Sequence, residues 1–116
     1  MMKKVNIMGT VYTIKYGTYK EFPFLKKCDG YTDTSTYEII VDNMSFAKND
    51  EDGKKDLETY KKQVLRHEII HAFLNESGLS NNSKFCESWA TNEEMVDWIA
   101  IQFPKIAKVF AYLNIM

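Results

Sequence analysis

The chain has 116 residues with a formal net charge of −1, and 45% of its residues are hydrophobic and 14% aromatic. This composition is typical of a single globular domain, residues 1–116, and excludes a disordered chain. The basic residues are 14 Lys and one Arg, whereas guanidinium is the usual group for bidentate phosphate binding. We therefore expect neither nucleic acid nor an anionic membrane as a partner.

The two cysteines, Cys28 and Cys86, are isolated in the sequence. Because they lack C-x-x-C spacing, they predict free thiols in a reducing compartment and not a disulfide. Residues 1–7 lack the apolar stretch of a secretory signal. No segment reaches the roughly 20 apolar residues of a membrane span. These features predict a soluble, cytoplasmic protein.

The first 41 residues predict a small antiparallel sheet of about three strands. Residues 3–17 alternate between apolar and polar side chains on both sides of Gly9, so Gly9 lies either in a tight hairpin turn or in a bulge. Residues 21–36 contain Pro23, an Asp-Gly pair and several Thr and Ser, which predicts a loop. Residues 37–41 are rich in β-branched side chains and predict the third strand.

A helical period follows from about Lys54 to Ser77. Asp50 or Asp52 is a plausible N-cap for this helix, and Gly78 predicts its stop in the left-handed conformation.

Residues 79–84 form a polar connector, after which a second helix that includes Trp89 extends to about Phe103. Pro104 is expected to break that helix, so that residues 105–113 form a third. Strands followed by helices indicate an α+β domain.

Both histidines of the chain belong to one motif, His67-Glu68-Ile69-Ile70-His71. On a helix, residues four apart differ by about 40° around the axis, so His67 and His71 project from one face and can both bind a tetrahedral metal such as Zn²⁺. Glu68 lies on the same side and can act as a general base without being a ligand. The alternative is a helix whose histidines only fill space.

A catalytic zinc ion normally has three protein ligands and one open position, and the chain has no third histidine. The third ligand should therefore be a carboxylate. The candidates after His71 are Glu76, Glu87, Glu93, Glu94 and Asp97. Glu76 lies about 140° around the helix from His71 and should point away. Glu87 is possible but belongs to the less regular start of the next helix.

Glu93 and Asp97 are four residues apart, so one can ligate the metal while the other accepts the free N–H of a ligating histidine. Thr91 and Glu94 match the S/T-x-x-E capping box, which gives Glu94 a structural role. Alternatively, all three acids belong to a solvated helix N-terminus that the helix dipole favours.

His67-Glu68-x-x-His71 followed by Asn92-Glu93-x-x-x-Asp97 resembles the motifs of the gluzincin metallopeptidases, of which thermolysin is the familiar member. The resemblance implies that Glu93 is the third zinc ligand and that Asp97 orients His67. Residues 66–73, 76–79 and 94–100 are similar to short prophage-encoded proteins of the ImmA/IrrE type. This similarity implies a small zincin-like domain in which the H-E-x-x-H helix carries the active site.

The resemblance implies a zinc-dependent peptidase in which Glu68 is the general base, with a regulatory protein of a phage or mobile element as a possible substrate. Gluzincins commonly use a further His or a Tyr to stabilise the oxyanion. This chain has no third His, and spacing singles out none of its seven Tyr. The alternative function is a catalytically inactive, zinc-stabilised binding or structural protein of a prophage.

Residues 37–41 carry one further expectation. If this strand is the sheet edge nearest the H-E-x-x-H helix, as in zincins, an extended peptide can bind there by strand addition. An ordinary strand without a ligand is the equally weighted alternative.

Overall fold

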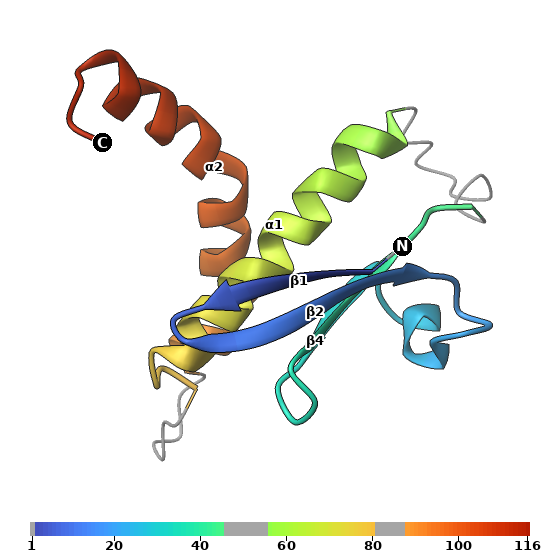
Figure 1. Cartoon of the computed structure of the whole chain (residues 1–116). Helices are drawn as coiled ribbons and strands as arrows, with labels where there is room; N and C mark the ends of the chain where they lie inside the picture. The colour runs from blue at the N-terminus through green and yellow to red at the C-terminus, as the bar shows by residue number, and fades with distance from the viewer. Residues whose placement is uncertain (1, 46–55, 81–87) are drawn as a thin grey trace.

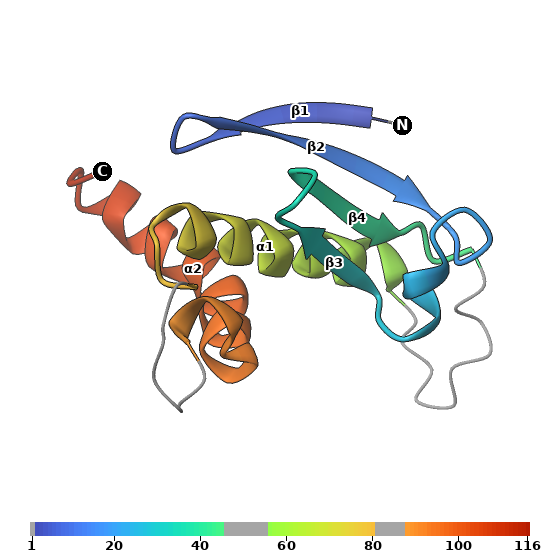
Figure 2. The same cartoon turned by 90° about the horizontal axis from the view of Figure 1, so that it is seen from below.

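The computed structural model describes residues 2–45, 56–80 and 88–116. A four-stranded sheet and a helix, α2 (Glu93–Tyr112), both pack against a long helix, α1 (Leu57–Glu76) (Figures 1 and 2). The domain is therefore α+β, in agreement with the sequence. None of the helices in the described ranges is long and apolar enough to cross a membrane.

The strands are β1 (Met2–Ile7), β2 (Thr10–Gly17), β3 (Gly30–Asp33) and β4 (Glu38–Asp42), in the spatial order β1-β2-β4-β3. β1 and β3 pair antiparallel with their neighbours, but β2 and β4 are parallel. The expected antiparallel sheet of about three strands is therefore wrong in both number and direction.

The difference arises in residues 21–36, which were expected to be a loop. They contain a short 3-10 helix, η1 (Pro23–Lys26), and the strand β3. This stretch carries the chain back to the starting end of β2, so β4 runs parallel to β2. β3 has only half-buried residues and no alternation, and its extended form depends on pairing with β4. Tertiary pairing of this kind overrides local preference.

The β1–β2 connection is a hairpin and not a bulge. Met8 and Gly9 form a two-residue turn with positive φ angles of 54° and 96°, which matches the twist of a hairpin. Ile7 and Thr10 are the first pair of the ladder, and the Asn6 side chain accepts a hydrogen bond of 2.8 Å from the Gly9 amide.

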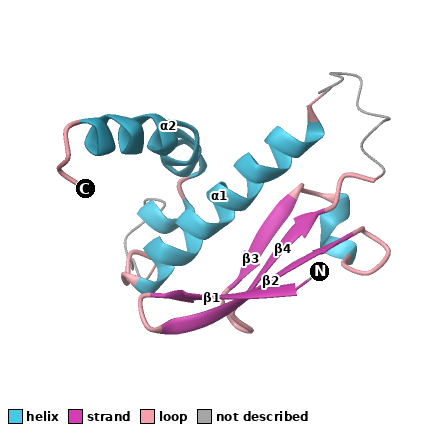
Figure 3. Cartoon of the chain, turned by 45° about the horizontal axis from the view of Figure 1, so that its top comes forward, coloured by secondary structure: helices cyan, strands magenta, loops and turns pink. Residues whose placement is uncertain are grey.

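β4 is an interior strand, so the peptide-binding role expected for residues 37–41 is wrong. It pairs with β2 on one side and β3 on the other. Ile39, Ile40 and Val41 are all buried, as is usual for a strand covered on both faces. The edges of the sheet are β1 and β3, and β3 runs beside α1 (Figure 3).

α1 begins at Leu57, three residues later than expected, because the Asp56 side chain caps it by accepting a hydrogen bond of 3.0 Å from the Thr59 amide. The expected caps, Asp50 and Asp52, lie outside the described residues. The helix ends at Glu76, and Gly78 adopts a φ of 84°, which confirms the predicted left-handed stop. Most of the predicted connector, from residue 81 onward, lies outside the described residues.

α2 continues through Pro104 to Tyr112, so the expected break into two helices is wrong. Trp89 precedes α2 in a short 3-10 helix, η3 (Trp89–Thr91). Proline lacks the N–H that would bond to the carbonyl four residues earlier, here that of Ala100. The Arg66 Nε of α1 donates a hydrogen bond of 2.8 Å to this carbonyl. α1 thus supplies the donor that Pro104 removes, and the bond ties the two helices together beside His67.

This arrangement predicts an energetic coupling between Arg66 and Pro104. Arg66→Met should cost about 1–3 kcal/mol of unfolding free energy, because it leaves the buried Ala100 carbonyl without a donor. In a Pro104→Ala background the helix can bond that carbonyl itself, so the same substitution should cost much less. Urea unfolding of the four proteins of this double-mutant cycle measures the coupling. Equal costs in both backgrounds would contradict the compensation.

Candidate metal centre

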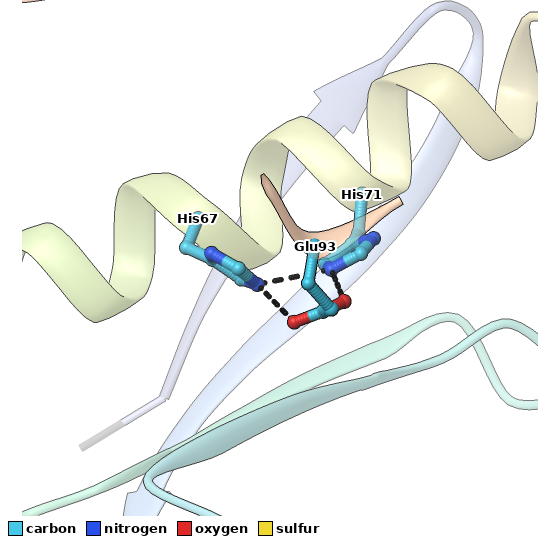
Figure 4. Close-up of side chains that lie close together, drawn as sticks. All are labelled: His67, His71 and Glu93. Carbon is cyan, nitrogen blue, oxygen red and sulfur yellow. Dashed lines mark hydrogen bonds and ion pairs between the residues drawn. The ribbon is translucent and has the colours of Figure 1, made fainter. Parts of the chain in front are cut away.

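Three predicted ligands converge on one point between the two helices. His67 and His71 project from one face of α1, and Glu93 reaches them from the first turn of α2 (Figure 4). His67 Nε2 lies 3.0 Å from His71 Nε2 and 3.1 Å from Glu93 Oε2, and His71 Nε2 lies 2.8 Å from Glu93 Oε1. The ligand atoms of these residues all lie within 4.8 Å of one another, so the group can hold a metal ion.

The contacts of the two Nδ1 atoms determine which ring nitrogen of each histidine faces the centre. His71 Nδ1 lies 2.5 Å from the Ala90 carbonyl oxygen, and His67 Nδ1 lies 2.7 Å from Asp97 Oδ1. A carbonyl or carboxylate oxygen can only accept, so each Nδ1 carries a proton. The neutral rings therefore present unprotonated Nε2 atoms to each other and to Glu93, which is the form that binds metals.

With both rings neutral, the centre brings together electron-pair donors with no hydrogen between them. Two Nε2 lone pairs and a carboxylate at 2.8–3.1 Å repel one another unless a cation, a proton or a metal ion lies among them. Ligand atoms of a tetrahedral zinc site with bonds of 2.0–2.1 Å are separated by about 3.3 Å. The observed separations are close to this value, and two imidazoles with one carboxylate are a common zinc ligand set, so these residues fit the metal.

Glu68 lies beside this group without joining it. Its side chain is buried, with 6% of the residue exposed, and its Oε2 lies 3.9 Å from His67 Nε2. Its Oε1 accepts a hydrogen bond of 2.9 Å from Thr32 Oγ1 on β3. Burial raises the pKa of the Glu68 carboxyl above its ordinary value, although the Thr32 hydrogen bond opposes the shift. A carboxyl in this position can accept a proton from a neighbouring group and later return it.

Thr32 and Gly30 also shape the candidate centre, although they belong to none of its sequence motifs. A Cβ atom at Gly30 would lie 2.7 Å from Val64 Cγ1 and 3.1 Å from the Ile40 carbonyl, so glycine allows β3 to approach α1 this closely. That approach places the Thr32 hydroxyl against Glu68. The signal in the sequence is the Asp-Gly pair, which predicts a turn in isolation.

The acid at the end of α1 has a separate structural role. Glu76 accepts hydrogen bonds of 2.6 Å from Thr10 Oγ1 and 2.7 Å from the Tyr12 hydroxyl, which lower the pKa of its carboxyl. These bonds join the end of α1 to the β1–β2 hairpin. Glu76 is thus directed away from the histidines, where the helix angle placed it.

The capping box expected for Thr91 and Glu94 is wrong. The N-cap of α2 is Asn92, whose Oδ1 accepts a hydrogen bond of 2.8 Å from the Met95 amide. Thr91 belongs to η3, and its hydroxyl donates to the Ser88 carbonyl. Glu94 is exposed on α2. The remaining candidate, Glu87, lies outside the described residues, as does Cys86.

Two hollows adjoin the centre, with volumes of about 370 Å³ and 200 Å³. Both are lined by Gly30, Glu68 and Glu93, so they meet at the candidate metal centre. Tyr31 lines the larger hollow and Tyr60 the smaller one, which places two of the seven tyrosines beside the centre. The centre therefore lies in a cleft bordered by the edge strand β3.

Adjacent acids at the start of α2 provide a matched test of the ligand assignment. Loss of an outer-shell partner typically lowers metal affinity about 10–100-fold. Glu93→Ala removes a ligand and should lower the affinity by more than this. Glu94→Ala should leave metal affinity unchanged and lower stability by about 0.3–1 kcal/mol through the helix dipole. Competition with a chromophoric chelator measures both affinities. A larger loss from Glu94→Ala than from Glu93→Ala would contradict the ligand set.

Comparisons of the chain with protein-family models, with curated proteins and with solved structures found no match. The function of this centre is therefore inferred from its side-chain chemistry, its geometry and its sequence motifs.

Proposed function

We propose that this protein is a zinc-dependent peptidase. The observation that carries the proposal is the position of the buried Glu68 carboxylate, 3.9 Å from the Nε2 of a histidine in a three-residue metal-binding group. A purely structural metal site has no use for an acid held in this position, whereas hydrolysis needs a general base there.

Zinc is the metal that best suits the donor set. Two neutral imidazoles and one carboxylate suit zinc, and catalytic zinc sites use three protein ligands and keep one position open. The group found among the described residues has three members: His67, His71 and Glu93. Asp97 and the Ala90 carbonyl hold the two rings in the required orientation, as outer-shell partners do in zinc enzymes.

The residues around the centre divide the chemistry between them. A bound zinc ion supplies Lewis acidity, which lowers the pKa of water and polarises a carbonyl. Glu68 Oε2 accepts the proton that the attacking water releases and returns it to the amine nitrogen as the peptide C–N bond breaks. Thr32 holds the other carboxylate oxygen, so that Oε2 remains directed toward the histidines.

The edge strand β3 offers a place for the substrate. Its outer side is unpaired within the described sheet, and Gly30, Tyr31 and Thr32 line the larger hollow beside the centre. An extended peptide paired with this edge would lie along the cleft, with a peptide bond near Glu68. The family resemblance adds the proposal that the natural substrate is a regulatory protein of a phage or mobile element.

The function is tested by Glu68→Gln, which preserves side-chain size but cannot accept the proton. The zinc-loaded variant should retain one zinc ion per chain and cleave a peptide mixture about 10²–10⁴-fold more slowly than the wild type. Mass spectrometry in ¹⁸O-labelled water identifies each new carboxyl terminus, and metal analysis gives the zinc content. Glu94→Gln is the matched control and should change neither quantity.

Two outcomes would contradict the peptidase proposal. Cleavage by Glu68→Gln at the wild-type rate would remove the general base from the mechanism. Zinc binding without any cleavage by the wild type would favour the alternative function, a zinc-stabilised binding protein.

A further inference from the structure

α2 exposes much more apolar surface than a surface helix normally does. From Trp98 to Met116, nine large apolar side chains are exposed, six on α2 and three just after its end. The helix extends away from the sheet toward the C-terminus (Figures 1 and 2). With about 150–250 Å² for a fully exposed large side chain, they present roughly 1,000 Å² of apolar surface. The largest apolar patch on a typical monomer is about 300–600 Å². Of these nine side chains, Trp98, Ile101 and Tyr112 lie in one line along α2, whereas Phe103 and Phe110 lie on another side of the helix.

One line of exposed residues gives this surface a pattern. Glu94, Trp98, Ile101, Lys105, Lys108 and Tyr112 are spaced alternately by four and three residues, so they form a single stripe along α2, here called the α2 stripe. It lies on the side of the helix opposite the buried Val96 and Ala100. A straight stripe with this period is the form in which one helix packs along another.

The charges of the α2 stripe are self-complementary. Its acid, Glu94, lies seven residues before Ile101, and Lys108 lies seven residues after it. No acidic residue follows Asp97 in the chain. When two copies of α2 pack antiparallel about a two-fold axis at Ile101, each Glu94 faces the Lys108 of the other copy. In a parallel arrangement Glu94 would instead face Glu94, and like charges would repel.

We propose that the α2 stripe is the interface of a homodimer in which two copies of α2 pack antiparallel about Ile101. A two-fold interface uses the same patch on both chains, which the stripe satisfies. Trp98 lies at the centre, where an aromatic anchor contributes most. Tyr112 of each copy reaches the start of the other α2, within a turn of a hollow of about 580 Å³ lined by Asn92, Glu94, Met95 and Trp98.

Sedimentation velocity over a concentration series tests the dimer and its register. Lys108→Glu places an acid opposite Glu94 at both ends of the interface and should raise the dimer Kd about tenfold. Adding Glu94→Lys restores opposite charges and should recover most of the affinity. Lys3→Glu, on the exposed outer strand β1, makes the same charge change elsewhere and should leave the Kd unchanged. Trp98→Ala should raise the Kd by roughly 30-fold.

Circular dichroism establishes that each variant remains folded. A wild type that stays monomeric throughout the series would overturn the proposal. Failure of Glu94→Lys to rescue Lys108→Glu would overturn the antiparallel register. Binding of the monomer to anionic phospholipid vesicles, lost on Trp98→Ala, would also overturn it, because the stripe would then contact a membrane surface. Zinc content and peptide cleavage do not enter this test, so its outcome is independent of the proposed function.

Discussion

The arrangement of the centre depends on three electron-pair donors, two imidazole nitrogens and a carboxylate, that are held within about 3 Å of one another. Asp97 and the Ala90 carbonyl each occupy an Nδ1 atom, so both Nε2 lone pairs face Glu93. Mutual repulsion at about 3 Å makes this arrangement favourable only around a cation. Such a preorganised site binds a metal ion more tightly, because the protein has already brought the ligands together.

The rest of the fold holds these donors in place from two sides. α2 must lie beside α1 for Glu93 and Asp97 to reach His67. The hydrogen bond from Arg66, the residue before His67, to the Ala100 carbonyl holds the two helices together at this point. On the other side, Gly30 lets β3 approach α1 so that Thr32 reaches Glu68. The ligands and the general base are thus positioned by different neighbours, and each neighbour satisfies a backbone or side-chain group that would otherwise lack a partner.

The sequence was most informative where a function requires fixed local spacing. His67 and His71 share a helix face because they are four residues apart, and the same spacing related Glu93 to Asp97. Residue spacing alone did not decide which of those two acids binds a metal; the structure separates them by placing Glu93 at Nε2 and Asp97 at Nδ1. Helical angle also directed Glu76 away from the centre correctly, while the structural role of that residue in joining α1 to the hairpin was not visible.

Features set by distant contacts could not be predicted. Pro104 is normally a helix breaker, and the Arg66 donor that satisfies the Ala100 carbonyl lies 38 positions earlier in the chain. β3 lacks strand-like alternation and exists because β4 lies beside it. Asn92 and not Thr91 caps α2, because Thr91 belongs to η3, which precedes α2 in the chain. The capping-box pattern carries no information about η3.

The most direct test of the central claim is a crystal structure of the zinc-loaded protein at the zinc absorption edge, with and without a peptide hydroxamate. We expect one anomalous peak per chain at the point where His67 Nε2, His71 Nε2 and Glu93 meet, with a solvent molecule in the remaining position that the hydroxamate displaces. A zinc ion bound by a fourth side chain of the protein, or no zinc at this point, would contradict the account.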